Sequence, residues 1–284
     1  MKHQSLPLRK KLKEIRAKKL KSAEAFVREI INEDYRKKIN LETPSQTILS
    51  IRSLLWEEYK KLEQSVTYHA LKSILYESHK KNDPIFKENL KTLQKEIGDD
   101  SNTVSNLAEI ASHSFSEIYE LSKSITQSRR SRAGGEFQAI ISLMMEIYGF
   151  EYDSQAKVGK NKLSEAGFKM VDGVFPSLAC LHTAKERCCI FTLKTSLRER
   201  WEEVVSEVER TKVPLIYLLT LDLSISKNVV MLMKDHNIML VTLREFKEKN
   251  PDVSNILSYE ELFLHELPSK LEWWKRKAQT KKVD

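Results

Sequence analysis

The order of the predicted elements between residues 169 and 243 limits the fold more than any other feature of the chain. Short apolar runs, rich in β-branched side chains, occupy residues 169–175, 188–195, 213–220, 228–233 and 238–243. A charged helical pattern over residues 198–211 separates the second run from the third. A strand, a helix and a strand in that order form a βαβ crossover, which requires a parallel strand pair. The sequence therefore predicts an α/β (α+β) fold, in which helices flank a mixed sheet.

The first half of the chain is predicted to be helical. From about residue 8 to residue 95, apolar side chains recur at intervals of three and four residues. Thr43-Pro44-Ser45 supplies the start of one helix, with Ser45 or Thr47 as its cap. The clearest loop lies at residues 98–102. We place a boundary there, between a helical N-terminal region of residues 1–100 and a core of residues 101–284.

Two further helices are predicted between this boundary and the first strand. One covers residues 103–127. The other begins at about Glu136 and presents Phe137, Ile140 and Met144 on one face. An apolar face of this kind is more typical of core packing than of a binding surface.

Basic residues are concentrated at the two ends of the chain. The whole sequence has 48 Lys and Arg against 40 Asp and Glu, a net charge of +8. Residues 1–21 contain nine basic side chains and one acid, and residues 270–284 contain six and two. Such a basic end is either a solvated tail or a phosphate-binding segment, and the composition fits both.

The remaining composition argues against secretion, a zinc site and a membrane partner. Cys180, Cys188 and Cys189 are odd in number and fit buried thiols in a reducing cytoplasm. The sequence has no Cys-x-x-Cys pair and no His-x-x-x-His spacing. It also lacks an apolar run long enough to span a bilayer. We therefore expect a cytoplasmic protein.

Asp172 and Lys194 carry the strongest chemical signal. Asp172 lies at the edge of one apolar run, and Lys194 ends the next run, 22 residues later. Hydrolysis of a phosphodiester needs an aligned hydroxide and positive charge near the phosphate oxygens. Enzymes commonly supply both with a lysine and with Mg²⁺ held by carboxylates. The two residues fit the first and last members of the PD-(D/E)xK pattern of metal-dependent nucleases.

The middle acid of that pattern is absent, because Thr192 stands two residues before Lys194. A single carboxylate binds Mg²⁺ poorly, but the helix after Lys194 offers Glu202, Glu203 and Glu207. Taken singly, the Asp-Gly pair fits a plain turn, and the lysine fits a solvated charge at a strand end. Only the joint pattern favours a nuclease site.

Three motifs in sequence order make a family resemblance specific. They are Ser131-Arg132-Ala133-Gly134-Gly135-Glu136-Phe137, Val171-Asp172-Gly173-Val174-Phe175-Pro176 and Lys194-Thr195-Ser196-Leu197-Arg198-Glu199-Arg200-Trp201. Over roughly residues 125–245, and more weakly over 45–60, the chain resembles the SsoII/PspGI/EcoRII group of type II restriction endonucleases. The resemblance implies a restriction-endonuclease-like sheet core. It also implies DNA binding by residues 1–100 and a catalytic core in residues 101–284.

The resemblance also implies the members of the active site. In that group the displaced acid lies on the helix after the lysine, 13 residues beyond it, which is Glu207 here. Asp172 and Glu207 are then Mg²⁺ ligands, and Lys194 orients water and stabilises the transition state. Where some members continue the first motif with Phe-Glu, this chain has Gln138, which excludes a carboxylate there. Glu136 is a weaker candidate for an acid near the metal, because a charge at a helix start explains it equally well.

The recognition residues are expected just after the catalytic lysine. Arginine forks suit guanine, and a carboxylate suits the amino group of cytosine, so Arg198, Glu199 and Arg200 can read adjacent C·G pairs. The same three residues also fit a salt-bridged helix face. In similar enzymes this triplet recognises the CC/GG half-sites.

A second group of residues is expected to hold flipped bases. Arg52 and Trp56 lie four residues apart and share one helix face. The local pattern alone favours a core position for Trp56. The resemblance instead implies that an aromatic ring and an arginine stack a base expelled from the centre of CCNGG. Gln127 is a candidate for a minor-groove contact nearby.

The sequence therefore predicts a homodimeric, Mg²⁺-dependent type II restriction endonuclease that cuts double-stranded DNA at a palindromic, CCNGG-like site. A CCWGG site is a near alternative. A nonspecific repair or mobile-element nuclease of the same fold, and a non-catalytic DNA-binding regulator, are kept as competing functions. No glycine-rich phosphate-binding motif is present, so no nucleotide cofactor is expected.

Overall fold

The chain forms two compact units in the computed structural model, which describes residues 5–80, 84, 87–88, 91–92, 100–158, 171–197, 201–211 and 213–280. The first unit combines Met1–Phe26 with Leu54–Arg132, and the second combines Val27–Ser53 with Ala133–Asp284. These packing units do not follow the sequence-based boundary at residue 100, because the chain passes between them within three helices, α2 (Ala23–Ile30), α4 (Pro44–Lys80) and α7 (Phe115–Ile147). The assignment of DNA binding to residues 1–100 and of catalysis to residues 101–284 stays a prediction.

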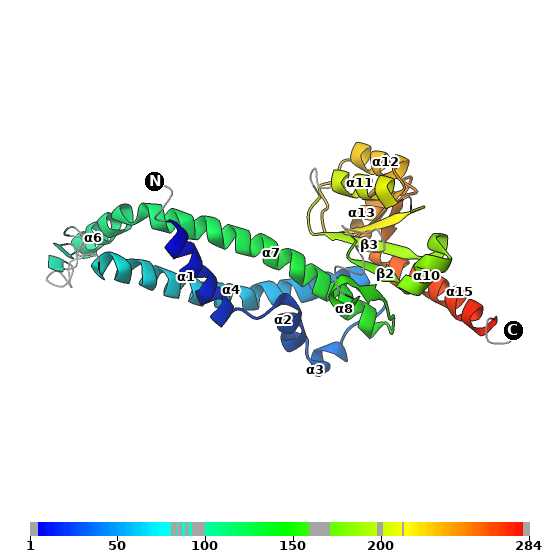
Figure 1. Ribbon diagram of the computed structural model, residues 1–284, viewed down its shortest axis with the longest axis horizontal. Helices are drawn as coiled ribbons and strands as arrows, with labels where there is room; N and C mark the ends of the chain where they lie inside the picture. The colour runs from blue at the N-terminus through cyan, green and yellow to red at the C-terminus, as the bar shows by residue number, and fades with distance from the viewer. Residues whose placement is uncertain are drawn as a thin grey trace. The chain divides into compact units, whose positions relative to one another are not determined.

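The first unit is helical. It contains α1 (Ser5–Lys19), α6 (Asp100–His113) and parts of α4 (Pro44–Lys80) and α7 (Phe115–Ile147). Three of these helices meet in a small apolar core, which includes Leu12 of α1, Ala70 and Ile74 of α4, and Leu121 of α7. Figure 1 shows α1 lying across the α4 and α7 segments of this unit. The helical N-terminal prediction is confirmed for the described residues.

The second unit contains a mixed six-stranded sheet in the order β1-β2-β3-β4-β5-β6. The first three strands are antiparallel neighbours, and β3 to β6 are parallel neighbours. The strands are β1 (Asp153–Ser154), β2 (Gly173–Phe175), β3 (Cys189–Lys194), β4 (Ile216–Thr220), β5 (Ile238–Thr242) and β6 (Ile256–Ser258). Helix α11 (Glu202–Thr211) connects β3 to its parallel neighbour β4, so the predicted βαβ crossover is confirmed.

The two faces of the sheet pack differently. One face packs against α10 (Leu178–Thr183), α11, α12 (Lys227–Asp235) and α13 (Arg244–Lys249). Along each strand, side chains on this face alternate with side chains on the opposite face. The strand residues on this face are Val174, Ile190, Ile216, Leu218, Ile238, Leu240 and Ile256. Figure 1 shows α11, α12 and α13 gathered on this side. On the other face, the rings of Phe191 and Tyr217 contact each other with centroids 6.1 Å apart.

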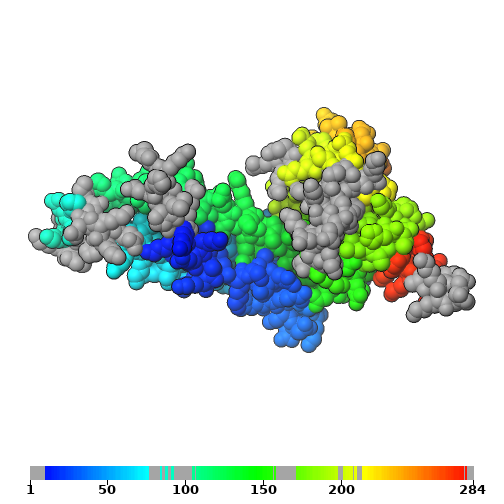
Figure 2. Space-filling view, in the orientation of Figure 1, coloured from blue at the N-terminus to red at the C-terminus, as the bar shows by residue number. Residues whose placement is uncertain are grey.

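The predicted strand at residues 228–233 is wrong, because this segment is part of helix α12. The side chain of Ser226 accepts a hydrogen bond from the Val229 backbone N–H and caps the helix start. Val230 and Met233 are buried three residues apart, whereas Met231 and Leu232 are 44% and 46% exposed. Atoms of α12, orange in Figure 2, lie at the protein surface on the face shown there. A three-residue spacing of buried side chains fits a helix and not a strand.

The predicted break before Glu136 is also wrong, because α7 runs without interruption from Phe115 to Ile147. Gly149, two residues after the end of the helix, has a φ of +72°, the left-handed conformation that glycine adopts without strain. The connection to β2 then includes β1 and the single turn α8 (Gln155–Val158).

A buried glutamate holds the start of α4, instead of the predicted Ser45 or Thr47 cap. Glu260 accepts hydrogen bonds from the Ser45 backbone N–H at 3.0 Å and from the Ser45 hydroxyl at 2.7 Å. Thr47 instead donates its hydroxyl to the Asn40 carbonyl. Glu260 follows Ser258, which forms a capping box with Glu261 at the start of α14 (Tyr259–Glu261). The helix continues through the π-helical turn η3 (Leu262–Glu266) into α15 (Leu267–Thr280).

Gly134→Ala is expected to stabilise the protein. A Cβ atom at this helical position would have no heavy atom within 4 Å. Alanine should therefore raise the free energy of unfolding by about 0.5–1 kcal/mol, measured by chemical denaturation. Gly149→Ala is the matched control, because its positive φ strains alanine and should destabilise the chain. A loss of stability in Gly134→Ala would contradict an open helix face there.

Candidate active site

Asp172 lies directly before β2 and is tied to both neighbouring segments. Its backbone N–H donates to the Phe191 carbonyl at 2.8 Å, and its carbonyl accepts from the Gln155 N–H at 2.8 Å. Its carboxylate oxygen Oδ2 accepts the Leu193 backbone N–H at 2.7 Å. The carboxylate is therefore fixed beside the end of β3, next to Lys194.

Gly173 is a strand residue, so the plain-turn alternative for the Asp-Gly pair is wrong. A Cβ atom at this position would lie 2.7 Å from the ring of Tyr152. The hydroxyl of Tyr152 is hydrogen-bonded to Ser142 at 2.6 Å, which restrains the ring. Glycine lets the Tyr152 ring approach the strand backbone closely, immediately beside Asp172.

Gln138 contacts the carboxylate directly, which the sequence did not predict. Its side-chain Nε2 donates to Asp172 Oδ1 at 2.6 Å. Both carboxylate oxygens of Asp172 thus accept an N–H hydrogen bond, and each keeps a free lone pair. The sequence signal for this residue is the Gln that stands after Phe137, where some members of the resembled group have Glu.

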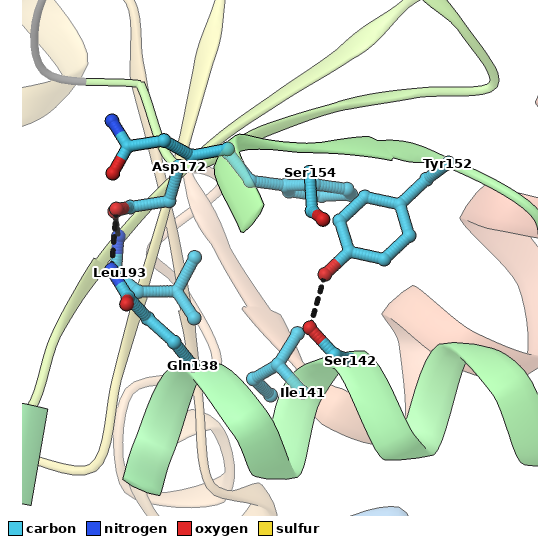
Figure 3. A pocket seen from close by; sticks show the side chains of 9 residues that line it. Gln138, Ile141, Ser142, Tyr152, Ser154, Asp172 and Leu193 are labelled. Carbon is cyan, nitrogen blue, oxygen red and sulfur yellow. Dashed lines mark hydrogen bonds between the residues drawn. The ribbon is translucent and has the colours of Figure 1, made fainter. Parts of the chain in front are cut away.

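A cleft of about 260 Å³ opens beside Asp172. Figure 3 shows Asp172 and Leu193 at one side of it, and the Ser142–Tyr152 hydrogen bond at the other. Its remaining lining residues are Gln138, Ile141, Ser154, Gln155 and Phe191. The acid is therefore accessible from a partly polar hollow and is not sealed in the core.

Burial raises the pKa of Asp172 above its ordinary value. The Leu193 hydrogen bond, the Lys194 charge and the Gln138 hydrogen bond oppose this shift and do not cancel it. The folded state thus disfavours the charged carboxylate. Asp172 therefore contributes its full stability below the pKa that it has in the unfolded state. The contribution decreases as the pH rises through the raised pKa of the folded state.

This sign predicts that Asp172→Asn stabilises the protein in EDTA at about pH 8, because the amide stays neutral. The melting temperature of the variant should exceed that of the wild type there. The difference should vanish below about pH 3.9, where the carboxyl is protonated in both states. Thermal unfolding across this range is the measurement. An equal melting temperature for both proteins at the higher pH would contradict the shift.

Lys194 ends β3 and is buried, with only 7% of the residue exposed. Its Nζ donates to Glu203 Oε2 at 3.2 Å, and the Glu203 side chain is 47% exposed. A buried ammonium group needs a partner of this kind. The alternative of a solvated lysine at the strand end is therefore wrong. Glu203 becomes a functional candidate, which the sequence indicated only as one of three acids on the following helix.

The other predicted members of the site are only partly described. The backbone of Glu207 lies in α11, whereas its side chain is outside the described residues. Arg198, Glu199 and Arg200 also lie outside them. Within the described part of the chain, no three His, Cys, Asp or Glu side chains form a group that could hold a metal ion. A complete set of metal ligands would therefore have to include groups beyond those described.

Glu136 is buried in the middle of α7, so the helix-start explanation for its charge is wrong. Gln127 is exposed on the same helix. Arg52 and Trp56 lie on α4, and both are exposed, Trp56 by 40%. The alternative of a core position for Trp56 is thus wrong as well.

The described cysteines agree with the expectation of buried thiols. Cys180, Cys188 and Cys189 are free and buried. Burial raises the pKa of the Cys189 thiol to about 12. Among the described helices, none combines the length and apolar character that a bilayer crossing requires.

Comparisons with known proteins agree on one family. The model of the EcoRII C-terminal family matches residues 96–262. The type II restriction enzyme SsoII of Shigella sonnei is 31% identical over 238 residues, which cover 82% of this chain and 71% of SsoII.

Two solved structures have the same fold. Metal-depleted Ecl18kI in complex with uncleaved DNA matches with a TM-score of 0.77 and 27% identity, covering 94% of this chain and 85% of Ecl18kI. A complex of the restriction endonuclease PspGI with substrate DNA matches with a TM-score of 0.58 and 15% identity, covering 89% and 94% of the two chains. The second likeness concerns the fold alone. The predicted restriction-endonuclease-like core is confirmed.

Proposed function

The chain belongs to the EcoRII C-terminal family of type II restriction enzymes, and from this we propose that it hydrolyses double-stranded DNA at a palindromic site with a CCNGG-like core. The proposed cofactor is Mg²⁺ and the proposed assembly is a homodimer, in which each subunit cuts one strand. The three free, buried cysteines suit a cytoplasmic location.

One observation carries this proposal. The carboxylate of Asp172 accepts a hydrogen bond from Leu193, the residue before Lys194, at 2.7 Å. The acid lines an open cleft, and the buried Lys194 at the end of β3 is near enough for its charge to act on the carboxylate. A phosphodiester needs a carboxylate-held cation and an ammonium group within reach of one phosphate, and this arrangement supplies both types of group.

The donor chemistry at Asp172 fits a magnesium ion. Oxygen ligands suit this cation. Burying a charged carboxylate costs free energy, and a bound cation would offset that cost at Asp172. Asp172 and Glu207 would hold the ion. When bound, Mg²⁺ supplies positive charge to the phosphate and lowers the pKa of water. Metal-depleted Ecl18kI was found with uncleaved DNA, which supports a metal requirement here.

The protein groups around the ion have separate roles. Lys194 orients the attacking water and stabilises the negative charge that develops on the phosphate oxygens. Glu203 holds the Lys194 ammonium in the site by the 3.2 Å contact. Gln138 fixes the orientation of the Asp172 carboxylate through its amide. Glu136 is a weaker candidate for an acid that acts near the metal site.

Sequence recognition is assigned to three neighbouring residues. Arg198 and Arg200 would contact guanines, and Glu199 a cytosine amino group, in each CC/GG half-site. Arg52 and Trp56 would stack the flipped central base, because stacking tolerates any base at that position. Gln127 would contact the minor groove beside it, and the basic N-terminal region would contact the flanking phosphates.

Arg198→Ala is expected to weaken specific binding by about 1–3 kcal/mol, because it removes a bidentate contact to guanine. Binding should be compared, in EDTA, for a duplex with the intact site and for one with that C·G pair exchanged. The loss should appear only on the intact site. An equal loss on both duplexes would show that Arg198 contacts the phosphate backbone and not the guanine.

A panel of duplexes tests the proposed recognition site. It contains CCNGG with each central pair, and variants in which each outer C·G pair is replaced. With Mg²⁺, strand scission at all four CCNGG duplexes and none at the variants supports the proposal. Cleavage restricted to A·T centres would favour CCWGG. Cleavage of every duplex would favour a nonspecific nuclease, and binding without scission a DNA-binding regulator.

A further inference from the structure

Glu63 and Arg129 form an ion pair within the first unit. Arg129 donates through Nε to Glu63 Oε1 at 2.7 Å and through a terminal nitrogen to Oε2 at 2.5 Å. Glu63 lies on α4 and is 8% exposed, whereas the side chain of Arg129 on α7 is 51% exposed. Two parallel hydrogen bonds fix the plane of a guanidinium group. The exposed arginine therefore has a defined orientation.

The guanidinium of Arg129 lies over the ring of Trp56, with its central carbon 5.6 Å from the ring centroid. The buried Tyr59 contacts the same indole, with ring centroids 6.0 Å apart. Trp56 is nevertheless 40% exposed. The indole is thus supported by two side chains of its own unit and remains partly open to solvent.

Apolar burial does not explain this arrangement. A large exposed aromatic ring adds little to a core, and a buried carboxylate is costly unless it is well paired. Here the carboxylate is used to hold a cation over the ring, an interaction that favours one orientation of the indole. A preorganised aromatic surface binds a planar ligand better than a mobile one, because less side-chain freedom is lost on binding.

We propose that Glu63 and Arg129 are positioning residues, which hold the indole of Trp56 ready to stack on an extrahelical nucleobase. This inference rests on the proposed function of Trp56 in base flipping and adds two residues behind it. Arg129 contacts the indole, and Glu63 acts only through Arg129. Neither residue needs to touch the base.

The test is a binding cycle between each side chain and the central base. Affinity is measured in EDTA for two duplexes, one with the intact recognition site and one with abasic sites at the central pair. Arg129→Ala and Glu63→Gln should each weaken binding of the intact site by about two- to fivefold, the range expected for one partly exposed cation–π contact. Neither should change affinity for the abasic duplex. Arg129→Lys should recover part of the loss, because it keeps the charge without the fork.

Two further variants separate the possible failures. Arg130→Ala removes an exposed arginine from the next position of the same helix and should weaken both duplexes equally. Trp56→Ala should lose affinity only for the intact site. If Trp56→Ala shows no such preference, the proposed stacking function fails. If it does, while Arg129→Ala and Glu63→Gln weaken both duplexes equally or neither, the positioning role is overturned. Circular dichroism of each variant checks that the helices are retained.

Discussion

Asp172→Ala is expected to abolish DNA cleavage while leaving DNA binding in place. The variant removes the carboxylate that lines the cleft beside the end of β3 and that is proposed to hold Mg²⁺. Loss of metal-supported charge stabilisation is worth several kcal/mol, and each 1.36 kcal/mol is tenfold in rate. Single-turnover cleavage should therefore fall by about 1,000-fold or more. Binding, measured at low salt in EDTA, should stay within a few-fold of the wild type.

Gln138→Leu is the matched control for this variant, because it removes a hydrogen bond to Asp172 and keeps the carboxylate. Its cleavage rate should fall far less, by about 10- to 100-fold, as is typical of a group that orients a metal ligand. Cleavage by Asp172→Ala at the normal rate would show that the proposed metal site is wrong.

Glu207→Gln is expected to have the second large effect, again a loss of about 1,000-fold or more in cleavage rate. The resemblance assigns the second metal-binding carboxylate to Glu207, four residues after Glu203 on α11. Glu203 instead pairs with Lys194 and is half exposed. Glutamine keeps a side-chain oxygen that can accept from the buried Lys194 ammonium, so Glu203→Gln should reduce the rate far less, by about 10- to 100-fold, as expected for a group that orients a catalytic side chain.

The comparison of the two glutamates decides which acid completes the site. Single-turnover rates of both variants should be measured over a range of Mg²⁺ concentrations. Excess Mg²⁺ should rescue part of the activity only in the variant that has lost a metal ligand. A large, Mg²⁺-dependent defect in Glu203→Gln together with a mild one in Glu207→Gln would reverse the assignment.

The sheet could be predicted from the sequence where local pattern and tertiary packing agree. Strands β3, β4 and β5 are buried on both faces, and their sequences are therefore nearly continuous apolar runs, which predict strands. The run at 228–233 has the same composition, but Ser226 caps it as a helix and only one of its sides is buried. Strands β1 and β6, with two and three residues, lie outside the predicted apolar runs.

The chemistry of the site was predictable only where a motif carried it. Asp172 and Lys194 come from neighbouring strands, and their spacing reflects one antiparallel connection. Gln138 reaches Asp172 from α7, 34 positions away, and no local pattern encodes that contact. Likewise, the burial of Lys194 depends on how α11 returns over the sheet. Contacts of this kind follow from packing between elements, which periodicity in one segment does not describe.

Digestion of plasmid DNA of known sequence, with Mg²⁺ and separately with EDTA, shows whether the protein is a metal-dependent, site-specific endonuclease. The ends of any fragments are mapped by sequencing. The expected result is a set of discrete ends at CCNGG-containing sites with Mg²⁺ and intact plasmid with EDTA. Intact DNA under both conditions, retarded by bound protein, would contradict an endonuclease.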